Sequence, residues 1–195
     1  SEFKYCFNVK NNGRIAMSTE DGQMHVIKAL DLPMSKLRDK GTPVDNITNY
    51  KSEDGAIIYV CNMDEMVLGR LLFATKNGLV KIVPGLEFET TRKTIASTKL
   101  ADKDEVAAVL PLTDEKNIIL KSRNGYFLRF QIEEISVLKK VSQGVRAMKL
   151  DAKDGVEEVY ITKAQDDAAI EHNGHSIVLN TVKLQKRDAK GTKLR

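Results

Sequence analysis

Four of the asparagine–glycine and aspartate–glycine pairs in the chain recur at a regular spacing, each between two apolar runs. The pairs are Asp21-Gly22, Asn77-Gly78, Asn124-Gly125 and Asn173-Gly174. They suit the two central positions of a tight β-hairpin turn, where both residues need a positive φ that Gly and Asn or Asp adopt most easily. The glycines are separated by 56, 47 and 49 residues. Four hairpins at such a regular spacing predict a repeat protein.

The segments around each hairpin follow one layout. An apolar run precedes the hairpin in units two to four, at residues 56–60, 105–110 and 156–161, and a short alternating segment follows it. In unit one the corresponding strand-like segment is 44–47. Helical periodicity is nearly absent, and only residues 131–140 suggest one short helical turn. The sequence therefore predicts an all-β chain.

Four-stranded sheets repeated about an axis are typical of a propeller, which leaves few open sheet edges. We expect a single domain over residues 1–195 with about four four-stranded blades. The blades lie roughly at residues 3–50, 56–100, 105–150 and 156–195.

The bulk composition sets limits on the setting of the protein. The chain is 42% apolar, and no run approaches the roughly eighteen apolar residues of a membrane helix. Cys6 and Cys61 lack the spacing of a metal or redox motif, which favours a reducing, cytoplasmic setting. The start has neither an initiator methionine nor a signal-peptide pattern, so we expect an excised domain without a leader. The net charge of +4 is too small by itself to predict a nucleic-acid partner.

The distribution of the positive charge follows the repeat. A seven-residue window rich in lysine and arginine ends seventeen to nineteen residues after each hairpin glycine. We call these the first (35–41), second (91–97), third (138–144) and fourth (185–191) basic windows; further cations follow each of the last three. The candidate DNA-binding residues are Lys36, Arg38, Lys40, Arg92, Lys93, Lys99, Lys139, Lys140, Arg146, Lys149, Gln185, Lys186, Arg187, Lys190 and Lys193.

Rotational symmetry would place these windows at equivalent positions and gather their cations around one rim. A basic rim gains affinity for duplex DNA by releasing counterions, and phosphate contacts carry no sequence information. Two other interpretations stay open. The windows are ordinary solvated loops, or the protein is a propeller-like interaction module whose loops bind an acidic partner.

Three stretches carry a family resemblance: residues 72–81 (LFATKNGLVK), 119–130 (ILKSRNGYFLRF) and 142–150 (SQGVRAMKL). Hairpins of this kind, each followed by a basic loop and a strand ending in Lys-Leu, resemble the C-terminal domain of type IIA DNA topoisomerase A subunits. Those subunits belong to DNA gyrase and topoisomerase IV. The resemblance extends over all four units and is strongest in units two and three.

The resemblance implies a β-pinwheel, a propeller-like disc whose neighbouring blades exchange a strand. It also implies a basic rim that binds and bends duplex DNA and presents segments to a separate cleavage core. The implied partners are duplex DNA, the N-terminal cleavage core of the same polypeptide and the ATPase B subunit, with no membrane. The implied location is the cytoplasm, at the nucleoid, and the isolated domain is expected to be monomeric.

The chain departs from the gyrase pattern in one motif. Gyrase subunits carry the box Q-[KR]-R-G-G-[KR]-G, and the best match here is the fourth basic window, where Asp188 and Ala189 stand in place of the two glycines. An acid in this loop would face DNA phosphate. The sequence thus favours topoisomerase IV, or a gyrase with a degenerate box. Gyrase domains usually have six blades, so four units imply a smaller or open disc.

Residues for catalysis or metal binding do not stand out. In this family the cleavage nucleophile is a tyrosine preceded by arginine, and none of the five tyrosines follows an arginine. His172 and His175 flank a turn without a third histidine or a cysteine to complete a metal site. We expect a non-catalytic domain without cofactor or metal, whose parent is an ATP-dependent type IIA topoisomerase.

Overall fold

The computed structural model describes residues 4–34, 40–51, 53 and 55–195. Within these ranges the chain is almost entirely strand and loop, with one α-helix, α1 (Met63–Met66). The strands are β1 (Arg14–Thr19), β2 (Gln23–Lys28), β3 (Ile57–Asn62), β4 (Arg70–Thr75), β5 (Leu79–Pro84), β6 (Thr94–Ala96), β7 (Val106–Leu112), β8 (Asn117–Ser122), β9 (Tyr126–Gln131), β10 (Val145–Arg146), β11 (Val156–Thr162), β12 (Ala169–His172), β13 (His175–Val178) and β14 (Thr192–Lys193). The short 3-10 helices are η1 (Ala29–Asp31), η2 (Val44–Asn46), η4 (Gly85–Phe88), η5 (Ile132–Glu134) and η6 (Leu179–Thr181).

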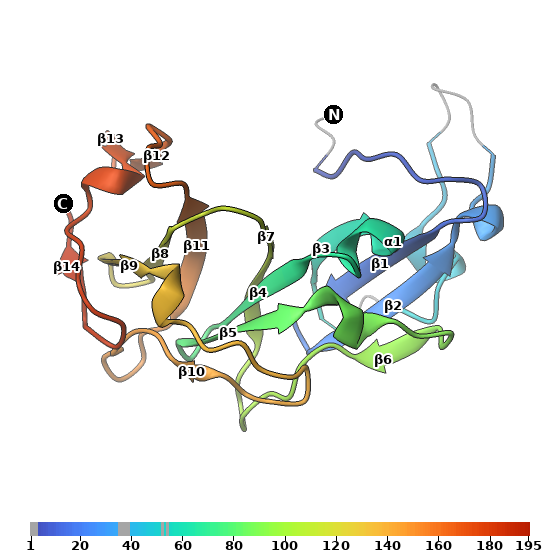
Figure 1. Ribbon diagram of the computed structural model, residues 1–195, viewed down its shortest axis with the longest axis horizontal. Helices are drawn as coiled ribbons and strands as arrows, with labels where there is room; N and C mark the ends of the chain where they lie inside the picture. The colour runs from blue at the N-terminus through green and yellow to red at the C-terminus, as the bar shows by residue number, and fades with distance from the viewer. Residues whose placement is uncertain (1–3, 35–39, 52, 54) are drawn as a thin grey trace.

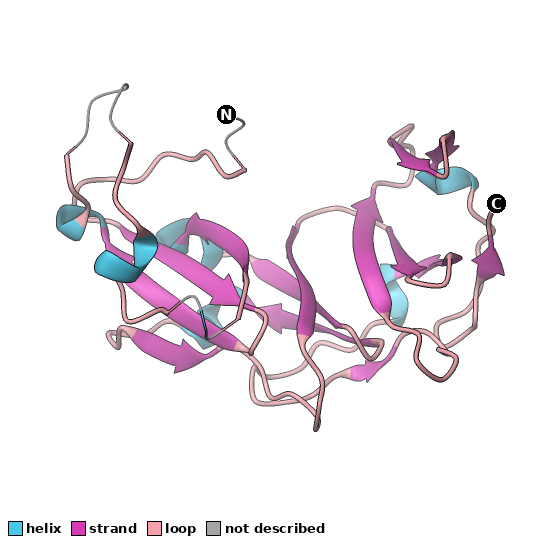
Figure 2. Ribbon diagram, turned by 180° about the vertical axis from the view of Figure 1, so that it is seen from behind, coloured by secondary structure: helices cyan, strands magenta, loops and turns pink. Residues whose placement is uncertain are grey.

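The described strands form three four-stranded antiparallel sheets and one two-stranded sheet. The strand orders are β3-β1-β2-β6, β10-β5-β4-β7 and β11-β8-β9-β14, and β12 pairs with β13. We number the four-stranded sheets in this order. Figure 1 shows the first sheet at one end of the molecule, the third at the other and the second between them. The view from behind in Figure 2 shows the same succession.

Neighbouring sheets exchange strands. The hairpin at the centre of each four-stranded sheet comes from one sequence unit, whereas both flanking strands come from the next unit. In the second sheet, for example, β4 and β5 belong to unit two, and β7 and β10 belong to unit three. Each four-stranded sheet therefore spans two of the units defined by the sequence period. The fourth hairpin has no following unit within the 195 residues and forms the two-stranded sheet.

These sheets confirm the predicted all-β fold with four-stranded blades, although three sheets of the described residues, and not four, have four strands. The four regularly spaced Asn-Gly or Asp-Gly pairs all lie in hairpin turns. The turn type was predicted correctly only once. Asn173 and Gly174 both have positive φ, 51° and 78°, in a two-residue turn. In the other three hairpins only the glycine is left-handed. Those loops are longer, and at Gly78 the amide donates to the Thr75 carbonyl at 3.0 Å, as in a type I turn closed by a left-handed glycine.

The core lies between successive sheets. Leu72 of β4 packs with Leu120 and Leu128 toward the third sheet. Its neighbour Phe73 packs with Met24 and Phe88 toward the first sheet and α1. Because strand residues alternate between faces, a strand covered on both sides must be apolar at every position, which accounts for the continuous run of β4.

Two local expectations need correction. Residues 44–47, predicted as a strand, begin the 3-10 helix η2, because Pro43 fixes an N-terminal φ of −56° and its carbonyl accepts from the Asn46 amide at 3.0 Å. Helix α1 was not predicted. It is a single turn capped by the Asn62 side chain, which accepts from the Glu65 amide, and one turn is too short for periodicity to reveal. None of the described helices has the length and apolar character needed to cross a membrane.

Candidate nucleic-acid interface

Three basic windows occupy equivalent places in the three four-stranded sheets. In the second window the Lys93 carbonyl accepts from the Val26 amide of β2 at 2.8 Å. The third and fourth windows begin with matching bonds, from the Leu138 amide to β5 and from the Gln185 amide to β9, both 2.8 Å long. Each window then leads into, or contains, a short strand that pairs with the same hairpin strand. The windows thus lie along β2, β5 and β9, the second strand of each hairpin.

Most of the candidate cations are accessible to solvent. Of the first window, Lys36 and Arg38 lie outside the described residues, and Lys40 is exposed. Lys140, Gln185 and Arg187 are half-buried. The remaining candidates are exposed: Arg92, Lys93, Lys99, Lys139, Arg146, Lys149, Lys186, Lys190 and Lys193.

The third window rests on a buried lysine that the sequence did not single out. Lys81 of β5 is 1% exposed, and its Nζ donates to the carbonyls of Lys140 at 2.8 Å and Ser142 at 2.5 Å. A third carbonyl, that of Lys139, lies at 3.4 Å. Neither Lys139 nor Lys140 joins an ion pair with any other described residue. The charges of this window are therefore available to a ligand.

The fourth window, by contrast, takes part in two ion pairs. Arg146 of β10 donates from Nε and Nη2 to the two Asp188 carboxylate oxygens at 2.6 and 2.7 Å. These bonds hold the pKa of Asp188 below its usual range and raise the pKa of Arg146. Lys190 Nζ lies 3.0 Å from Asp151 Oδ2. Asp188 was expected to face DNA phosphate, but its carboxylate is bound by Arg146 of the preceding unit.

Backbone contacts fix the same loop. Arg187 Nη1 donates to the Arg146 carbonyl at 2.7 Å, and the Arg187 amide donates to Glu134 at 3.2 Å. Asp188 is left-handed, with φ of 68°, a conformation that glycine adopts more easily. Lys190 and Lys193 stand 4.7 and 5.7 Å from the centre of the half-buried Tyr126 ring. Cations and an aromatic face thus meet at one point beside β9.

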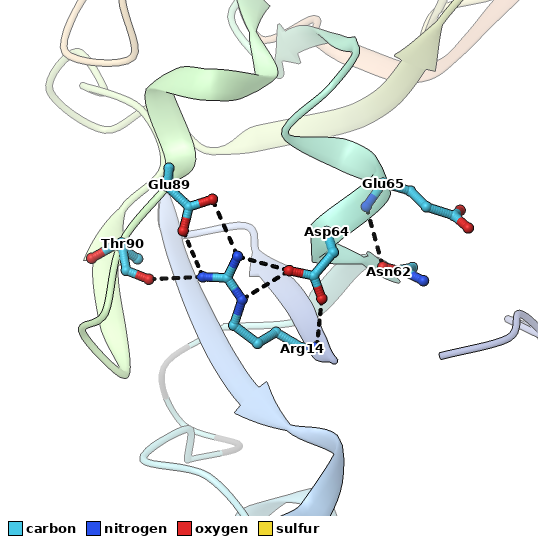
Figure 3. A network of polar contacts seen from close by, with 6 residues as sticks. All are labelled: Arg14, Asn62, Asp64, Glu65, Glu89 and Thr90. Carbon is cyan, nitrogen blue, oxygen red and sulfur yellow. Dashed lines mark hydrogen bonds and ion pairs between the residues drawn. The ribbon is translucent and has the colours of Figure 1, made fainter. Parts of the chain in front are cut away.

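A polar network joins the first and second sheets, as Figure 3 shows. The Arg14 guanidinium on β1 binds Asp64 of α1 at 2.8 Å and Glu89 at 2.7 Å, and also donates to the Thr90 carbonyl. Hydrogen bonds from Arg14 lower the pKa values of both carboxyl groups. Because Glu89 and Thr90 precede the second window, Arg14 fixes the start of that window. The partners lie 50 and 75 residues away in sequence, so no local pattern could have revealed them.

The two histidines beside the fourth turn have different surroundings. His172 is 7% exposed and meets the Phe127 ring edge-on at 4.9 Å, whereas His175 is exposed. Among the described residues no three His, Cys, Asp or Glu side chains form a group able to hold a metal ion.

Comparison with known proteins places this fold. Residues 69–113 and 116–163 match the family described as DNA gyrase C-terminal domain, beta-propeller. The DNA gyrase A subunit of Rickettsia felis is 30% identical over 147 residues, which are 73% of this chain and 16% of that protein. The DNA topoisomerase 4 A subunit of Streptococcus pneumoniae is 36% identical over 121 residues, 59% of this chain and 14% of that protein.

The chain belongs to the family of C-terminal domains of type IIA topoisomerase A subunits. The solved C-terminal domain of DNA topoisomerase IV superposes with a TM-score of 0.83 at 22% identity, covering 94% of this chain and 58% of that structure. The E. coli ParC C-terminal domain superposes with a TM-score of 0.78 at 16% identity, covering 99% of this chain and 81% of the other. The fold is accordingly a β-pinwheel. The chain spans less than a fifth of the length of these two curated relatives.

Proposed function

We propose that this domain binds and bends duplex DNA with little dependence on sequence, through the basic windows along β2, β5 and β9. The observation that carries this proposal is the equivalent placement of three windows. Each offers an exposed cation without an ion pair among the described residues: Arg92, Lys139 and Lys186. Phosphate contacts of this kind supply affinity and register but no base discrimination.

We include bending in the proposal because the chain has the β-pinwheel fold, a propeller-like disc, whose edge a duplex in contact with successive sheets must follow. Each window belongs to a different four-stranded sheet, and the sheets follow one another along the molecule (Figure 1). A duplex that touches all three windows must follow that row. Smooth bending of a short site by about 40–90° costs roughly 1–6 kcal/mol, which several phosphate contacts offset.

We assign the domain an accessory, non-catalytic role in a longer topoisomerase polypeptide. The names of its relatives support a bacterial type IIA topoisomerase as the parent, and no tyrosine here follows an arginine. In that parent, DNA cleavage lies in a separate N-terminal core and ATP hydrolysis in a B subunit. The proposed location is the cytoplasmic nucleoid, and the isolated domain is a monomer. Because A subunits of both DNA gyrase and topoisomerase IV match the chain, the comparison does not favour either parent. The degenerate box in the fourth window is what favours topoisomerase IV.

Salt titration of duplex binding tests this function. The logarithm of the binding constant is expected to fall linearly with the logarithm of salt concentration, with a slope of about −0.9 per neutralised phosphate. The variant with Arg92, Lys139 and Lys186 changed to Ala should make that slope shallower by roughly three.

A matched variant removes three cations outside the windows. Lys103→Asn and Lys153→Asn suit their left-handed positions, with φ of 57° and 68°, and Lys163→Ala changes an exposed side chain. This control should leave the slope within about one of the wild type. An equal decrease of the slope in both variants would show that the basic windows are not the DNA interface. A wild-type domain whose binding ignores salt, or which duplex DNA does not displace from an acidic protein, would favour a protein-interaction module.

A further inference from the structure

The ammonium of Lys81 is satisfied by backbone alone. Burial of an unpaired ammonium is strongly unfavourable, so a lysine with 1% exposure must find partners. It does so with three carbonyls of one loop, those of Lys139, Lys140 and Ser142, at 3.4, 2.8 and 2.5 Å. An ammonium has three N–H donors, so the three carbonyls match its full capacity. The Phe73 ring lies below it, 5.5 Å from Nζ.

Neighbouring contacts close the same loop around this charge. The Lys140 amide donates to Glu87 of η4 at 3.3 Å, and Thr98 Oγ1 donates to the Ser142 carbonyl at 3.4 Å. Ser142 Oγ donates back to the Lys139 carbonyl at 2.7 Å. The carbonyl oxygens of 139, 140 and 142 therefore converge on the protein interior, while the Lys139 side chain is exposed and that of Lys140 is half-exposed.

We propose that Lys81 is the positioning residue of the third basic window, and that its buried ammonium holds residues 139–142 in the conformation that presents Lys139 and Lys140 to DNA phosphate. This inference rests on the proposed DNA-binding function. Lys81 does not touch the DNA; it acts through the loop above it.

The equivalent positions in the other sheets indicate that this device is specific to one window. Lys81 stands opposite Phe73 in its hairpin, as Leu128 stands opposite Leu120 and His25 opposite Met17. The Leu128 side chain is apolar and cannot donate a hydrogen bond to the loop. In the first sheet, His25 Nδ1 lies 3.1 Å from Thr94 Oγ1 of the second window. A basic side chain under the window thus occurs in two sheets, and of the three described residues Lys81, Leu128 and His25 it is Lys81 that binds the loop through three carbonyls.

The arrangement makes the third window sensitive to pH. Burial lowers the pKa of Lys81 to about 8, and the nearby Glu87 carboxylate acts in the opposite direction. The other groups next to the Lys81 ammonium are uncharged: Lys139 and Lys140 contact it through their backbone carbonyls, and Phe73 through its ring. A neutral amine has two donors and a lone pair, so above the pKa one carbonyl loses its partner and meets a lone pair instead. The loop should then loosen, and DNA affinity should fall as the pH rises.

Duplex affinity at pH 7 and about pH 9 tests this proposal in four proteins. These are the wild type, Lys81→Met, the double variant Lys139→Ala/Lys140→Ala, and Leu128→Met as a matched control in the third sheet. Wild type and control should lose affinity about tenfold on going to the higher pH, as expected for two phosphate contacts. Lys81→Met and the double variant should bind about tenfold more weakly than wild type at pH 7 and change little with pH. The substitutions leave every cysteine, histidine and tyrosine of the chain unchanged.

The outcomes separate the two proposals. If Lys81→Met keeps wild-type affinity and pH dependence while the double variant is weakened, Lys81 is not a positioning residue, and the DNA-binding function stands. If wild type does not bind duplex DNA in a salt-dependent manner, the proposed function itself fails. Should Lys81→Met not fold, NMR titration of the wild type decides. The Lys140 and Ser142 amide resonances should then shift with the same midpoint, near pH 8, as the affinity, and their invariance would overturn the proposal.

Discussion

The third and fourth basic windows follow the same path along a hairpin strand, yet their charges are held in opposite ways. Under the third window a buried cation, Lys81, binds the loop from below, and the lysines above it keep their charge free of ion pairs among the described residues. In the fourth window an acid within the loop, Asp188, binds Arg146 of the preceding unit. Equivalent backbone geometry therefore does not ensure equivalent positive potential. The difference lies in the charged group that holds each loop: a buried lysine beneath the third window, and within the fourth an aspartate that pairs with an exposed arginine.

The largest expected effect tests the backbone that the two windows share. Gly144 and Gly191 both close a window with positive φ, 107° and 88°. A Cβ would lie 2.7 Å from the Val80 carbonyl oxygen in the first case and 2.5 Å from that of Phe127 in the second. Either Gly→Ala change should destabilise the domain by about 3 kcal/mol, because the strain of the left-handed backbone and the steric overlap of the new Cβ add. Denaturant unfolding measures this.

A matched glycine separates strain from overlap. Gly174 has φ of 78° but open space around its Cβ position. Gly174→Ala should therefore cost only about 1 kcal/mol, from the left-handed conformation alone. Equal costs at all three glycines would show that the close approach to β5 and β9 contributes nothing.

The second effect concerns the lysines. Lys139→Ala/Lys140→Ala should weaken duplex binding about tenfold at low salt, because two unpaired charges are lost. Lys186→Ala/Lys190→Ala removes the same formal charge but should cost only about threefold, since Lys190 is already shared with Asp151. Fluorescence anisotropy with one labelled duplex compares them. A larger loss in the fourth window would reverse the proposed ranking.

The third effect is a gain. Asp188→Gly releases Arg146, removes an acid from the interface and places glycine at a left-handed position. Duplex affinity should rise about fivefold and its salt dependence should steepen by about one phosphate contact. Asp167→Asn, which removes an exposed acid away from the windows, should change affinity little. A gain of equal size in that control would show that the higher affinity comes from the change in net charge alone.

The smallest effect lies between the first and second sheets. Asp64→Asn should cost about 0.5 kcal/mol at pH 7, because the Asp64 side chain in its ion pair with Arg14 is nearly half exposed. The pKa of Asp64 is lowered in the folded state, so its contribution is present above the ordinary value of 3.8 and is lost as the pH falls through the lower folded value. The difference in unfolding free energy between wild type and variant should therefore shrink toward pH 2. A constant difference would exclude the ion pair as its source.

The hairpins and the apolar strands could be predicted because their signals are local. A glycine with a preceding Asn or Asp marks each turn, and the runs at 105–110 and 156–161 became β7 and β11. The exchange of strands could not be derived from the period, since a regular repeat gives the same spacing whether a hairpin pairs with its own unit or with the next. Turn type depended on loop length, which the Asn-Gly pair alone does not determine.

The windows could be located from sequence, but not the state of their charges. Asp188 and Arg146 are 42 residues apart and meet only because β10 and the fourth window lie side by side. Lys81 was not singled out from the sequence. Its position was nevertheless a clue, because it alternates with Val80 and Ile82 and so shares a strand face with Val83, which is fully buried.

The exchange of strands also governs how a domain of this kind can change in length. Since both neighbours of every hairpin are supplied by the segment that follows, insertion or loss of one whole segment leaves each remaining hairpin with an equivalent pair of neighbours. Only the final hairpin lacks them, as β12 and β13 do here. Gene duplication can thus extend the array one sheet at a time without redesigning any existing contact surface.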